Sequence, residues 1–589
     1  MTHTRKRHPH GRGFQQLAVL LLLWLGLGLQ TTAQEAQQPE ETTALIQRQS
    51  VTAQTYMVVA AHPLAAEVGQ QILARGGSAA DAAVAIQMML NLVEPQSSGI
   101  GGGAFALYWD ASENKLTSWD GRETAPLAAT PDYWLGTDGT PVKWQEAVVG
   151  GRSVGVPGTL KLLDVLHKNY GTMDWSSLLL PAILQAEEGF AVTPRLHASI
   201  ARAADFNLTA APVTQTYFLD PQGQPWPAGH LLKNPAFAET LGLIAAKGIE
   251  HFYEGPVAAE IIVATRGSDN PGLLTTEDFR AYTVKSRPPV CADYRAYQVC
   301  GMGPPSSGGL TVGQILKLLE PFDLPALGPS PEAWHVFIEA SKLAYADRGL
   351  YMADSDFADM PEGLLNTAYL ADRARLIDPA RAMDAATPGT PPWDDAQLWA
   401  PDTQTERPGT SHFVVVDAAG DMISMTTTIE TGFGSGLMVG GFLLNNELTD
   451  FSRAPVRDGR PLANRVEGGK RPRSSMAPTI VLEDGQPILL TGSPGGSRII
   501  AYVAQSLIAM LDWQMDPQDA IDQGHVVNRN GATDLEELSD AATLQDPLTA
   551  LGHDIKIRNL NSGLHVIRIN KDGLIGAADK RREGLALGD

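Results

Sequence analysis

The chain has 589 residues, of which 43 % are hydrophobic and 19 % are charged, a composition typical of a globular protein with a large core. Its 44 basic and 66 acidic residues give a formal net charge of -22, and the basic residues cluster only at the extreme N-terminus. Because binding phosphates needs a basic patch, this charge pattern argues against nucleic acid as a partner.

The first 33 residues have the layout of a secretory signal. A basic start is followed by an apolar run over residues 17–29 and by small residues that end at Ala33, which is the order that signal peptides share. The alternative is an uncleaved membrane anchor, but this run is shorter than the roughly 20 apolar residues that a membrane-spanning helix needs. We therefore predict that residues 1–33 are removed and that the mature protein is exported, periplasmic or secreted, without a stable membrane anchor.

Helical and strand patterns alternate along the first half of the chain. Two helical runs lie within residues 62–93, separated by two glycines, and Ser78 and Asp81 are the capping residues of the second run. The stretch EPQSSGIGGGAFALYWD then predicts a glycine-rich turn that leads into a strand. A further apolar helix pattern covers residues 331–348.

The two cysteines of the chain, Cys291 and Cys300, flank the stretch ADYRAYQV. A short hairpin that turns near residues 294–296 would bring them together, so a disulfide is one expectation for an exported protein. Two unpaired thiols are the alternative. Without a histidine partner set, two cysteines make a poor zinc site.

Residues 378–409 differ in kind from the rest, with six prolines and almost no periodicity. This is typical of a linker or a functional loop, and we expect it to be mobile. From Thr410 onward the sequence turns to strands, with SHFVVVD, the turn AAG and DMISMTTTI, and later an Asp-Gly hairpin in TIVLEDGQPILLTG. A long apolar helix follows over residues 497–513. Strands and helices come in blocks, which indicates layered packing with substantial antiparallel sheet.

Two generic motifs fit their usual function poorly. GRSVG matches the nucleophile elbow around Ser153, yet that motif requires a helix directly after the serine, and Pro157 breaks such a helix. GIGGGA resembles a dinucleotide loop but precedes a strand rather than a helix. No HExxH or EF-hand pattern occurs in the sequence, so it indicates neither a metal nor a cofactor.

A pair of threonines gives the first candidate for chemistry. If AAG is a three-residue hairpin loop with Gly420 in the left-handed conformation, Asp417 pairs with Asp421 and Thr410 lies opposite Thr428. Two hydroxyl groups would then face each other across neighbouring strands. A slip of one residue would undo the pairing, and the alternative is that both threonines are there for their β propensity.

Glycines and polar residues elsewhere predict a substrate site. Gly495 and Gly496 come between a strand and a helix, where backbone amides favour a developing negative charge; an ordinary turn is the alternative. A guanidinium with hydroxyls suits a carboxylate, and paired acids suit an ammonium group. A zwitterion would fit the following set, although each member alone is more typical of a surface or packing residue: Arg122, Glu447, Asp450, Ser474 and Ser475.

Several motifs, in their order, resemble those of the γ-glutamyltransferase (glutathione hydrolase) family of N-terminal-nucleophile hydrolases. They are SSGIGGGAF, SVGVPGT, PPSSGG, TSHFVVVD, FLLNNELTDFS, KRPRSSMAPTIV and GSPGGSRI. The resemblance implies an α+β fold, a layered αββα sandwich with two stacked, mainly antiparallel sheets between helical layers. It also implies a proenzyme that cuts itself between Gly409 and Thr410 into a large subunit, residues 34–409, and a small subunit, residues 410–589, which stay together as a heterodimer in one interleaved fold.

The resemblance also implies roles for the candidate residues. Thr410 would be the nucleophile, and its new α-amino group, with a reference pKa of about 8, would be the base. Thr428 would orient Thr410, and the amides of Gly495 and Gly496 would form the oxyanion hole. Of the polar set above, the guanidinium and the two hydroxyls would hold the α-carboxylate of a γ-glutamyl donor, and the two acids would hold its α-amino group. The glutamyl group would pass to water or to an amino-acid or peptide amine, without a cofactor.

Two departures from the family pattern touch substrate choice. The position two after Thr428, an asparagine and donor ligand in the best-known members, is Glu430 here, and the stretch over residues 451–474 is shortened and lacks Tyr and Trp. Both features resemble the subgroup that grades into cephalosporin and glutaryl acylases, so such an acylase is a second prediction. A third is a non-catalytic extracytoplasmic binding protein for amino acids or peptides, which would remain one uncleaved chain.

Overall fold

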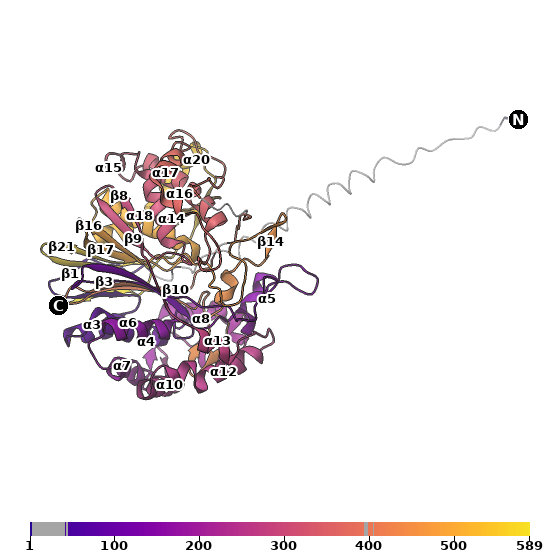
Figure 1. Cartoon of the computed structure of the whole chain (residues 1–589), viewed down its shortest axis with the longest axis vertical. Coiled ribbons are helices and arrows are strands. Elements are labelled where there is room, and N and C mark those ends of the chain that lie inside the picture. The colour runs from indigo at the N-terminus through magenta and orange to yellow at the C-terminus, as the bar shows by residue number, and fades with distance from the viewer. Residues whose placement is uncertain (3–41, 43–44, 394–398, 405) are drawn as a thin grey trace.

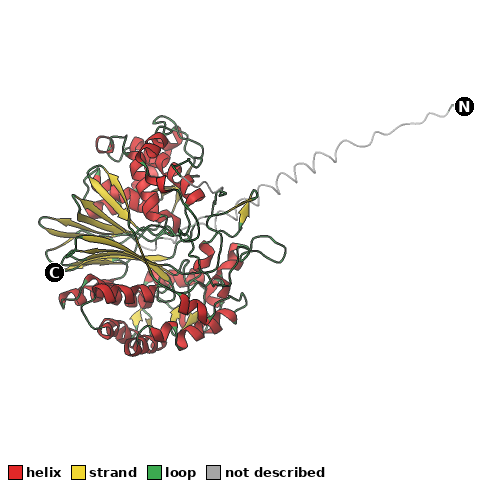
Figure 2. Ribbon diagram, in the orientation of Figure 1, coloured by secondary structure: helices red, strands yellow, loops and turns green. Residues whose placement is uncertain are grey.

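The computed structural model describes residues 1–2, 42, 45–393, 399–404 and 406–589. Two seven-stranded sheets lie face to face, and a layer of helices covers the outer side of each (Figures 1 and 2). This arrangement confirms the αββα sandwich that the sequence predicts. Apart from its first two residues, the predicted signal lies outside the described residues.

The first sheet, called the threonine sheet below, carries Thr410 on a central strand. Its strands are β2 (Met57–Ala60), β3 (Gly103–Asp110), β4 (Lys115–Gly121), β7 (Lys285–Arg287), β10 (Thr410–Val416), β11 (Met422–Thr428) and β23 (Leu585–Gly588). They lie in the order β23-β2-β10-β11-β3-β4-β7, and each neighbouring pair is antiparallel. The strand that begins with Thr410 is therefore held on both sides.

The second sheet is also antiparallel throughout. Its strands are β1 (Val51–Ala53), β8 (Val290–Tyr294), β9 (Tyr297–Gly301), β16 (Thr479–Glu483), β17 (Gln486–Gly492), β21 (His565–Asn570) and β22 (Gly573–Ala578). Their order is β1-β22-β21-β17-β16-β9-β8. Cys291 and Cys300 face each other across β8 and β9 and form a disulfide, so the hairpin and its pairing follow the first of the two expectations.

Helices of the first half of the chain cover the threonine sheet, and a second group covers the other sheet (Figure 1). The first group includes α3 (Pro63–Ala74), α4 (Ala79–Val93), α6 (Thr159–Tyr170), α7 (Trp175–Glu188), α10 (Pro235–Lys247) and α12 (Pro256–Arg266). The second includes α14 (Gly308–Leu319), α16 (Pro331–Tyr351), α18 (Ile499–Leu511) and α20 (Gln545–Ala550). Shorter helices are α5 (Trp144–Val148), α8 (Pro194–Ala203), α9 (Pro212–Phe218), α13 (Thr276–Ala281), α17 (Thr367–Ala374) and α19 (Pro517–Asp522).

The core of the sandwich has layers because successive side chains of a strand point to opposite faces. On β10, Val414 and Val416 join the core between the sheets, whereas Phe413 and Val415 pack on the helix side. Every residue of β10 and β11 is buried. The start of β10 therefore lies in the interior of the precursor.

Local sequence signals gave several elements correctly. Ser78 and Asp81 form a capping box at the start of α4, and the Asp-Gly turn between β16 and β17 has both residues at positive φ. In the turn between β10 and β11, Gly420 has a φ of +88° and the Asp417 amide donates to the Asp421 carbonyl. The register then places Thr410 opposite Thr428, as predicted.

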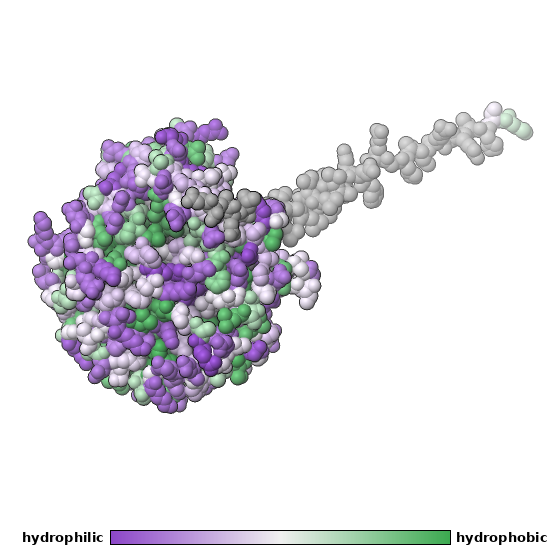
Figure 3. Space-filling view, in the orientation of Figure 1, coloured by the Kyte–Doolittle hydropathy of each residue, from purple (hydrophilic) through white to green (hydrophobic). Residues whose placement is uncertain are grey.

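The described part of residues 378–409 forms no named strand or helix. It contacts the rest of the fold near its end, where Ala400 makes a β-bridge with Leu462 and where Asp402 and Glu406 are buried. Its mobility after cleavage stays a prediction. None of the described helices is long and apolar enough to cross a membrane, and polar side chains are spread over the face seen in Figure 3, with apolar ones in scattered groups.

Candidate active site

The predicted site residues converge on one small pocket at the ends of several strands. Gly409 and Gly495 adjoin this pocket along the chain, and the residues that line it include Arg122, Glu406, Arg407, Thr410, Thr428, Glu430, Glu447, Asp450, Ser474, Ser475 and Gly496. Glu406 and Arg407 are the members that the sequence did not predict. They belong to the segment that would end at the new C-terminus.

Thr410 and Thr428 meet at the junction with Gly409. The Thr428 hydroxyl donates to the Gly409 carbonyl at 2.7 Å, and the Thr410 hydroxyl donates to that of Thr428 at 3.5 Å. The backbone amide of Glu430 donates to the Thr428 hydroxyl at 2.8 Å, and Arg582 donates to the Thr410 carbonyl at 3.1 Å. The carbonyl that Thr410 would attack is therefore polarised by a fixed hydroxyl.

Gly409 has no room for a side chain. A Cβ at this position would lie 2.0 Å from the carbonyl oxygen of Glu430 and 2.7 Å from the carbonyl carbon of Thr431. Glu430 itself has a φ of +77°, a conformation that non-glycine residues other than asparagine and aspartate adopt rarely. The junction therefore packs against a tight turn of backbone.

Gly495 and Gly496 lie where β17 ends, before a short 3-10 turn and α18. Their φ values are +136° and +58°, and a Cβ on Gly496 would lie 2.5 Å from the carbonyl of Arg407. The Ser497 amide donates to the Glu406 carbonyl at 3.2 Å. In the uncleaved chain the pre-junction segment therefore packs against Gly496 and the residue after it, and the oxyanion role of the two glycines stays a prediction.

One buried group of charges, called the acid cluster, consists of Arg122, Glu123, Glu430, Glu447 and Asp450. Arg122 donates to Glu447, to Asp450 at 2.6 Å and to two backbone carbonyls. Burial raises the pKa values of Glu447 and Asp450 well above the ordinary range although Arg122 lowers them, and burial raises the pKa of Glu123 to about 8. The cluster thus contains four acids and one guanidinium, which contacts two of them. This imbalance of charge favours the binding of an additional cation here.

Glu430 lies at the edge of the acid cluster. Asn446 donates to its carboxylate at 2.5 Å, and burial raises its pKa although Asn446 and Arg407 oppose the shift. Glu430 in turn raises the pKa values of Glu447 and Asp450. The Glu430 carboxylate is therefore one more acidic group at a site that already holds three others.

A second buried group, called the cation cluster, consists of Arg348, Arg473 and Ser475 around the carboxylate of Glu406. Arg348 donates to both oxygens at 2.6 Å, Arg473 at 3.1 Å and the Ser475 hydroxyl at 2.9 Å. Burial would raise the pKa of Glu406, but Arg348 and Arg473 lower it to about 2. The Ser474 hydroxyl instead accepts from the Met476 amide, so of the two predicted serines only Ser475 contacts this carboxylate.

The sequence missed these residues for a physical reason. Arg348 lies in the last turn of α16 and Arg473 follows a turn, so neither stands in a local pattern that marks a site. The signal that could have found them is the charged pair Glu406–Arg407, which stands close before the predicted cut. Charged residues are rarely buried without partners, so a buried pair there would need oppositely charged residues nearby.

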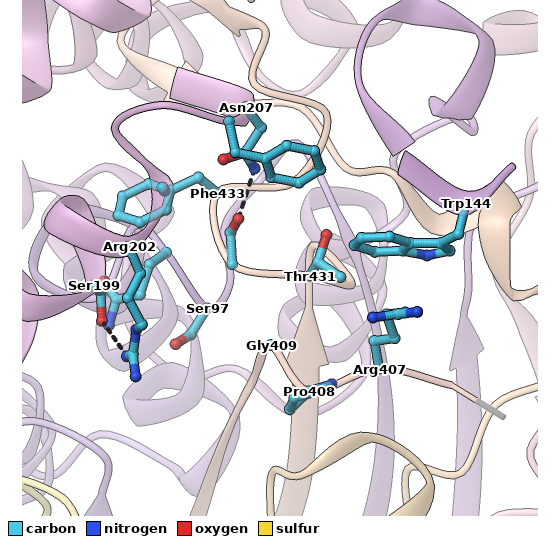
Figure 4. Close-up of a pocket in the computed structure, with 14 residues that line it drawn as sticks. Ser97, Trp144, Ser199, Arg202, Asn207, Arg407, Pro408, Gly409, Thr431 and Phe433 are labelled. Carbon is cyan, nitrogen blue, oxygen red and sulfur yellow. Dashed lines mark hydrogen bonds between the residues drawn. The ribbon is translucent and has the colours of Figure 1, made fainter. Parts of the chain in front are cut away.

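A larger pocket of about 320 Å³ opens beside the junction (Figure 4). The guanidinium of Arg407 stacks on the Trp144 ring, 3.6 Å from its centroid, and Figure 4 shows the two side chains facing each other next to Pro408 and Gly409. The other residues around this pocket include Ser97, Ser199, Arg202, Phe206, Asn207, Thr431 and Phe433. Gly409, on one side of the predicted cut, therefore borders an open pocket.

Other candidate residues have structural partners. Ser153 is buried and its hydroxyl donates to the carbonyls of Val148 and Gly150, which agrees with the rejection of the elbow motif. Among the described residues, the group with metal-ligand chemistry is His335, Glu339 and His553. The two imidazoles hydrogen-bond each other and Glu339 accepts from Lys342 at 2.8 Å, so a cation is already present there.

Comparison with known proteins agrees with the fold. Residues 65–588 match the gamma-glutamyltranspeptidase family model. The glutathione hydrolase proenzyme of Bacillus subtilis (strain 168) is 37 % identical over 546 residues, covering 90 % of this chain and 91 % of that protein. A cephalosporin acylase from Bacillus halodurans superposes with a TM-score of 0.80 at 29 % identity, covering 92 % and 97 % of the two chains. The gamma-glutamyltranspeptidase of Helicobacter pylori gives 0.53 at 36 % identity, covering 57 % and 94 %.

Two stacked antiparallel sheets between helices, with a threonine at the first position of a central strand, define an N-terminal-nucleophile hydrolase. Within this class, the chain belongs to the γ-glutamyltranspeptidase family. It is therefore an enzyme of that family rather than a non-catalytic binding protein.

Proposed function

We propose that the chain is the precursor of a γ-glutamyltransferase and glutathione hydrolase in which Thr410 is the nucleophile of both self-cleavage and turnover. The observation that carries this proposal is the hydrogen-bonded line from the Thr410 hydroxyl through Thr428 to the Gly409 carbonyl. It supports a hydroxyl attack on that carbonyl because nucleophile and polarising donor are already adjacent.

Self-cleavage at this junction needs only groups of the chain and water. Thr410 Oγ adds to the Gly409 carbonyl carbon, the C–N bond breaks as the nitrogen takes up a proton, and water hydrolyses the resulting ester. The freed α-amino group has a reference pKa of about 8 and can accept the hydroxyl proton near neutral pH. Residues 34–409 and 410–589 would remain one heterodimer because their strands alternate in the threonine sheet, where β2 pairs with β10 and β23, and β3 pairs with β11.

Turnover is acyl transfer through a γ-glutamyl ester on Thr410, with water or an amino-acid or peptide amine as acceptor. Thr428 orients the nucleophile, and the amides of Gly495 and Gly496 stabilise the oxyanion once the segment above them has moved. The donor's charges would be held by the remaining predicted residues, Arg122, Ser474 and Ser475 for the carboxylate and Glu430, Glu447 and Asp450 for the ammonium. No step requires a cofactor.

A denaturing gel of wild type beside Thr410→Ala tests the proposal. We expect the wild type to give two fragments that meet at residues 409 and 410, and the variant to remain one chain. Thr410→Ser should retain part of the cleavage because a hydroxyl and an amine remain. Splitting of Thr410→Ala at this position, or an intact purified wild type, would show that the nucleophile is another residue.

A cephalosporin or glutaryl acylase with the same nucleophile is the second candidate, favoured by Glu430 in the acid cluster. A glutaryl donor carries the carboxylate of a γ-glutamyl donor but lacks its α-amino group. The kcat/KM values for a γ-glutamyl anilide and for the matching glutaryl anilide separate the two candidates. Rapid glutaryl release with little γ-glutamyl release would favour the acylase.

The proposed enzyme acts outside the cytoplasm. Removal of residues 1–33 would make Gln34 the first residue of the large subunit, in accordance with the signal-like layout. N-terminal sequencing of the large subunit purified from the native host's export compartment tests this. A subunit that still begins at Met1 would contradict it.

A further inference from the structure

A second pocket, called the basic pocket below, has a volume of about 410 Å³ and is lined neither by Thr410 nor by the acid cluster. Its walls come from α16, from residues 386, 388 and 401–404, and from a small sheet of three strands. The mechanism above does not use it. The basic residues that give the pocket its name are Arg498, Arg529, Lys556 and Arg558.

The small sheet brings three of these basic residues together. Its strands are β18 (Val526–Asn528), β19 (Thr533–Glu536) and β20 (Ile555–Arg558), in that order. Lys556 and Arg558 are two residues apart on β20, so their side chains point to the same face, and Lys556 pairs with Asp534 of β19. Arg529 directly follows β18, and Arg498 directly precedes α18. Four basic side chains from three segments therefore share one cavity.

The carboxylate that these basic side chains share is that of Asp534. It accepts from Arg498 at 3.0 Å and from Arg558 at 2.7 Å. A nitrogen of Arg529 lies 3.8 Å from it, which is beyond hydrogen-bond distance. Lys556 has no carboxylate within ion-pair distance in the part of the chain that the structure describes. Four basic groups thus share one acid, although the chain as a whole has a net charge of -22.

The other charged residues on the wall of the basic pocket do not change this balance. Arg348 is bound to the carboxylate of Glu406. Asp402 accepts from the Ser452 hydroxyl at 2.7 Å and lies 3.4 Å from Arg473. Both therefore have partners outside the group of four basic residues, and the excess of positive charge remains.

This excess favours an anion for electrostatic reasons. Burial and the nearby charge of Arg498 lower the pKa of Arg529 to about 10, which still leaves its guanidinium charged near neutral pH. Charges of one sign in a concave site focus the field and raise the local concentration of the opposite charge. Guanidinium groups bind carboxylate and phosphate oxygens in pairs. A ligand with more than one negative charge would offset the excess best.

We propose that the basic pocket is a binding site for a small multivalent anion that carries carboxylate or phosphate groups. Arg529 and Lys556 would be its main ligands, because Arg498 and Arg558 already donate to Asp534. The volume of the pocket lies within the range usual for small-molecule sites. The four basic residues all follow Thr410 in the sequence, so the site does not rest on the proposed function and should exist before and after cleavage.

Calorimetric titration tests the site without any turnover. Citrate and pyrophosphate represent the two kinds of multivalent anion, and acetate is the monovalent control, all at the same ionic strength. We expect citrate or pyrophosphate to bind both wild type and Thr410→Ala at one site per chain, and more tightly than acetate. The tighter of the two identifies the group that the pocket prefers. If neither binds more tightly than acetate, the proposal is wrong.

Lys556→Gln locates the bound anion. Because Lys556 has no ion pair with a described acid, the variant should keep the melting temperature of wild type when no anion is added. It should bind the preferred anion about tenfold more weakly, the effect of losing one hydrogen bond between charged groups. Lys571→Gln removes the same charge from an exposed position outside the pocket and is the matched control. Equal affinities of the two variants would place the anion elsewhere and overturn the proposal.

Substitutions of Arg529 test the second ligand. Arg529→Gln should also weaken binding about tenfold, and Arg529→Lys should weaken it less, because it keeps the charge but not the planar fork. The anion should raise the melting temperature of wild type more than that of Arg529→Gln, since a ligand stabilises the state that binds it. Wild-type affinity in Arg529→Gln would remove Arg529 from the site and overturn the proposal as stated.

Discussion

The acid cluster and the cation cluster lie on the same pocket and are both buried, yet they balance their charges in different ways. In the acid cluster, Arg122 is bound to Glu447 and Asp450, and none of the three lies in the segment before Gly409. In the cation cluster, Arg348 and Arg473 are bound to Glu406, which lies three residues before Gly409. If the proposed cleavage frees that segment, the acid cluster keeps its partners and the cation cluster loses one.

The difference matters for the proposed function, in which one cut would create the nucleophile and release the segment that carries Glu406. The acid cluster holds more acids than cations, which suits an ammonium group. A γ-glutamyl donor has such a group and a glutaryl donor lacks it, so the acid cluster is the part of the site that would distinguish the two donors.

The loss of Arg122 should have the largest effect, which is a decrease in the free energy of unfolding. Arg122→Gln leaves Glu447 and Asp450 without their cation in the interior, and breaking a buried pair in this way costs about 3–5 kcal/mol. Arg348→Gln should cost less than half of that because Arg473 and Ser475 still hold Glu406. Both costs are differences in the free energy of unfolding, measured by urea denaturation of the Thr410→Ala precursor. Equal shifts in the two variants would show that the two clusters do not differ in this way. The Arg122 effect should also shrink as the pH falls, because the buried acids then take up protons.

The next largest effect should be on the rate of self-cleavage, when Gly409 is replaced. Gly409→Ala places a Cβ against the Glu430 carbonyl, 2.0 Å away without rearrangement, and must displace the carbonyl that Thr410 attacks. A displacement of about 1 Å can slow such a step by about 100-fold. Quantitative gels of the precursor over time measure this, with Pro408→Ala as a neighbouring control. Cleavage of Gly409→Ala at the wild-type rate would show that the junction can move freely.

The sequence predicted the contacts that local patterns determine and missed those that join distant segments. The register of β10 and β11 was predictable because a three-residue turn and a two-residue side-chain period determine it locally, and Thr410 and Thr428 followed from it. The pairing of Arg348 with Glu406 was not, because it joins the last turn of α16 to a segment without periodicity. The sequence also did not show that Arg122 contacts the two acids rather than an open carboxylate position.

The preference for γ-glutamyl over glutaryl donors should depend on pH, and only through the acid cluster. Burial raises the pKa values of Glu447 and Asp450 well above their ordinary range and that of Glu123 to about 8. Glu123 therefore loses its proton as the pH passes through about 8, and the negative charge of the acid cluster increases. The ratio of kcat/KM for γ-glutamyl over glutaryl anilide should therefore rise about tenfold as the pH passes through 8. The titration of the shared nucleophile cancels in the ratio. A ratio that stays constant from about pH 6.5 to about pH 9 would contradict the assignment of the donor's ammonium group to the acid cluster.

Glu430→Asn should have the smallest effect and separates charge from backbone conformation. Glu430 has a φ of +77°, which asparagine tolerates better, so the variant should stabilise the Thr410→Ala precursor by about 1 kcal/mol. It also removes a charge that raises the pKa values of Glu447 and Asp450, so the rise in donor ratio should move to lower pH. Glu430→Gln is the matched control, because it removes the same charge but keeps the unfavourable φ. It should shift the pH dependence without stabilising the precursor; if both variants leave the pH dependence unchanged, Glu430 does not act on the acid cluster during turnover.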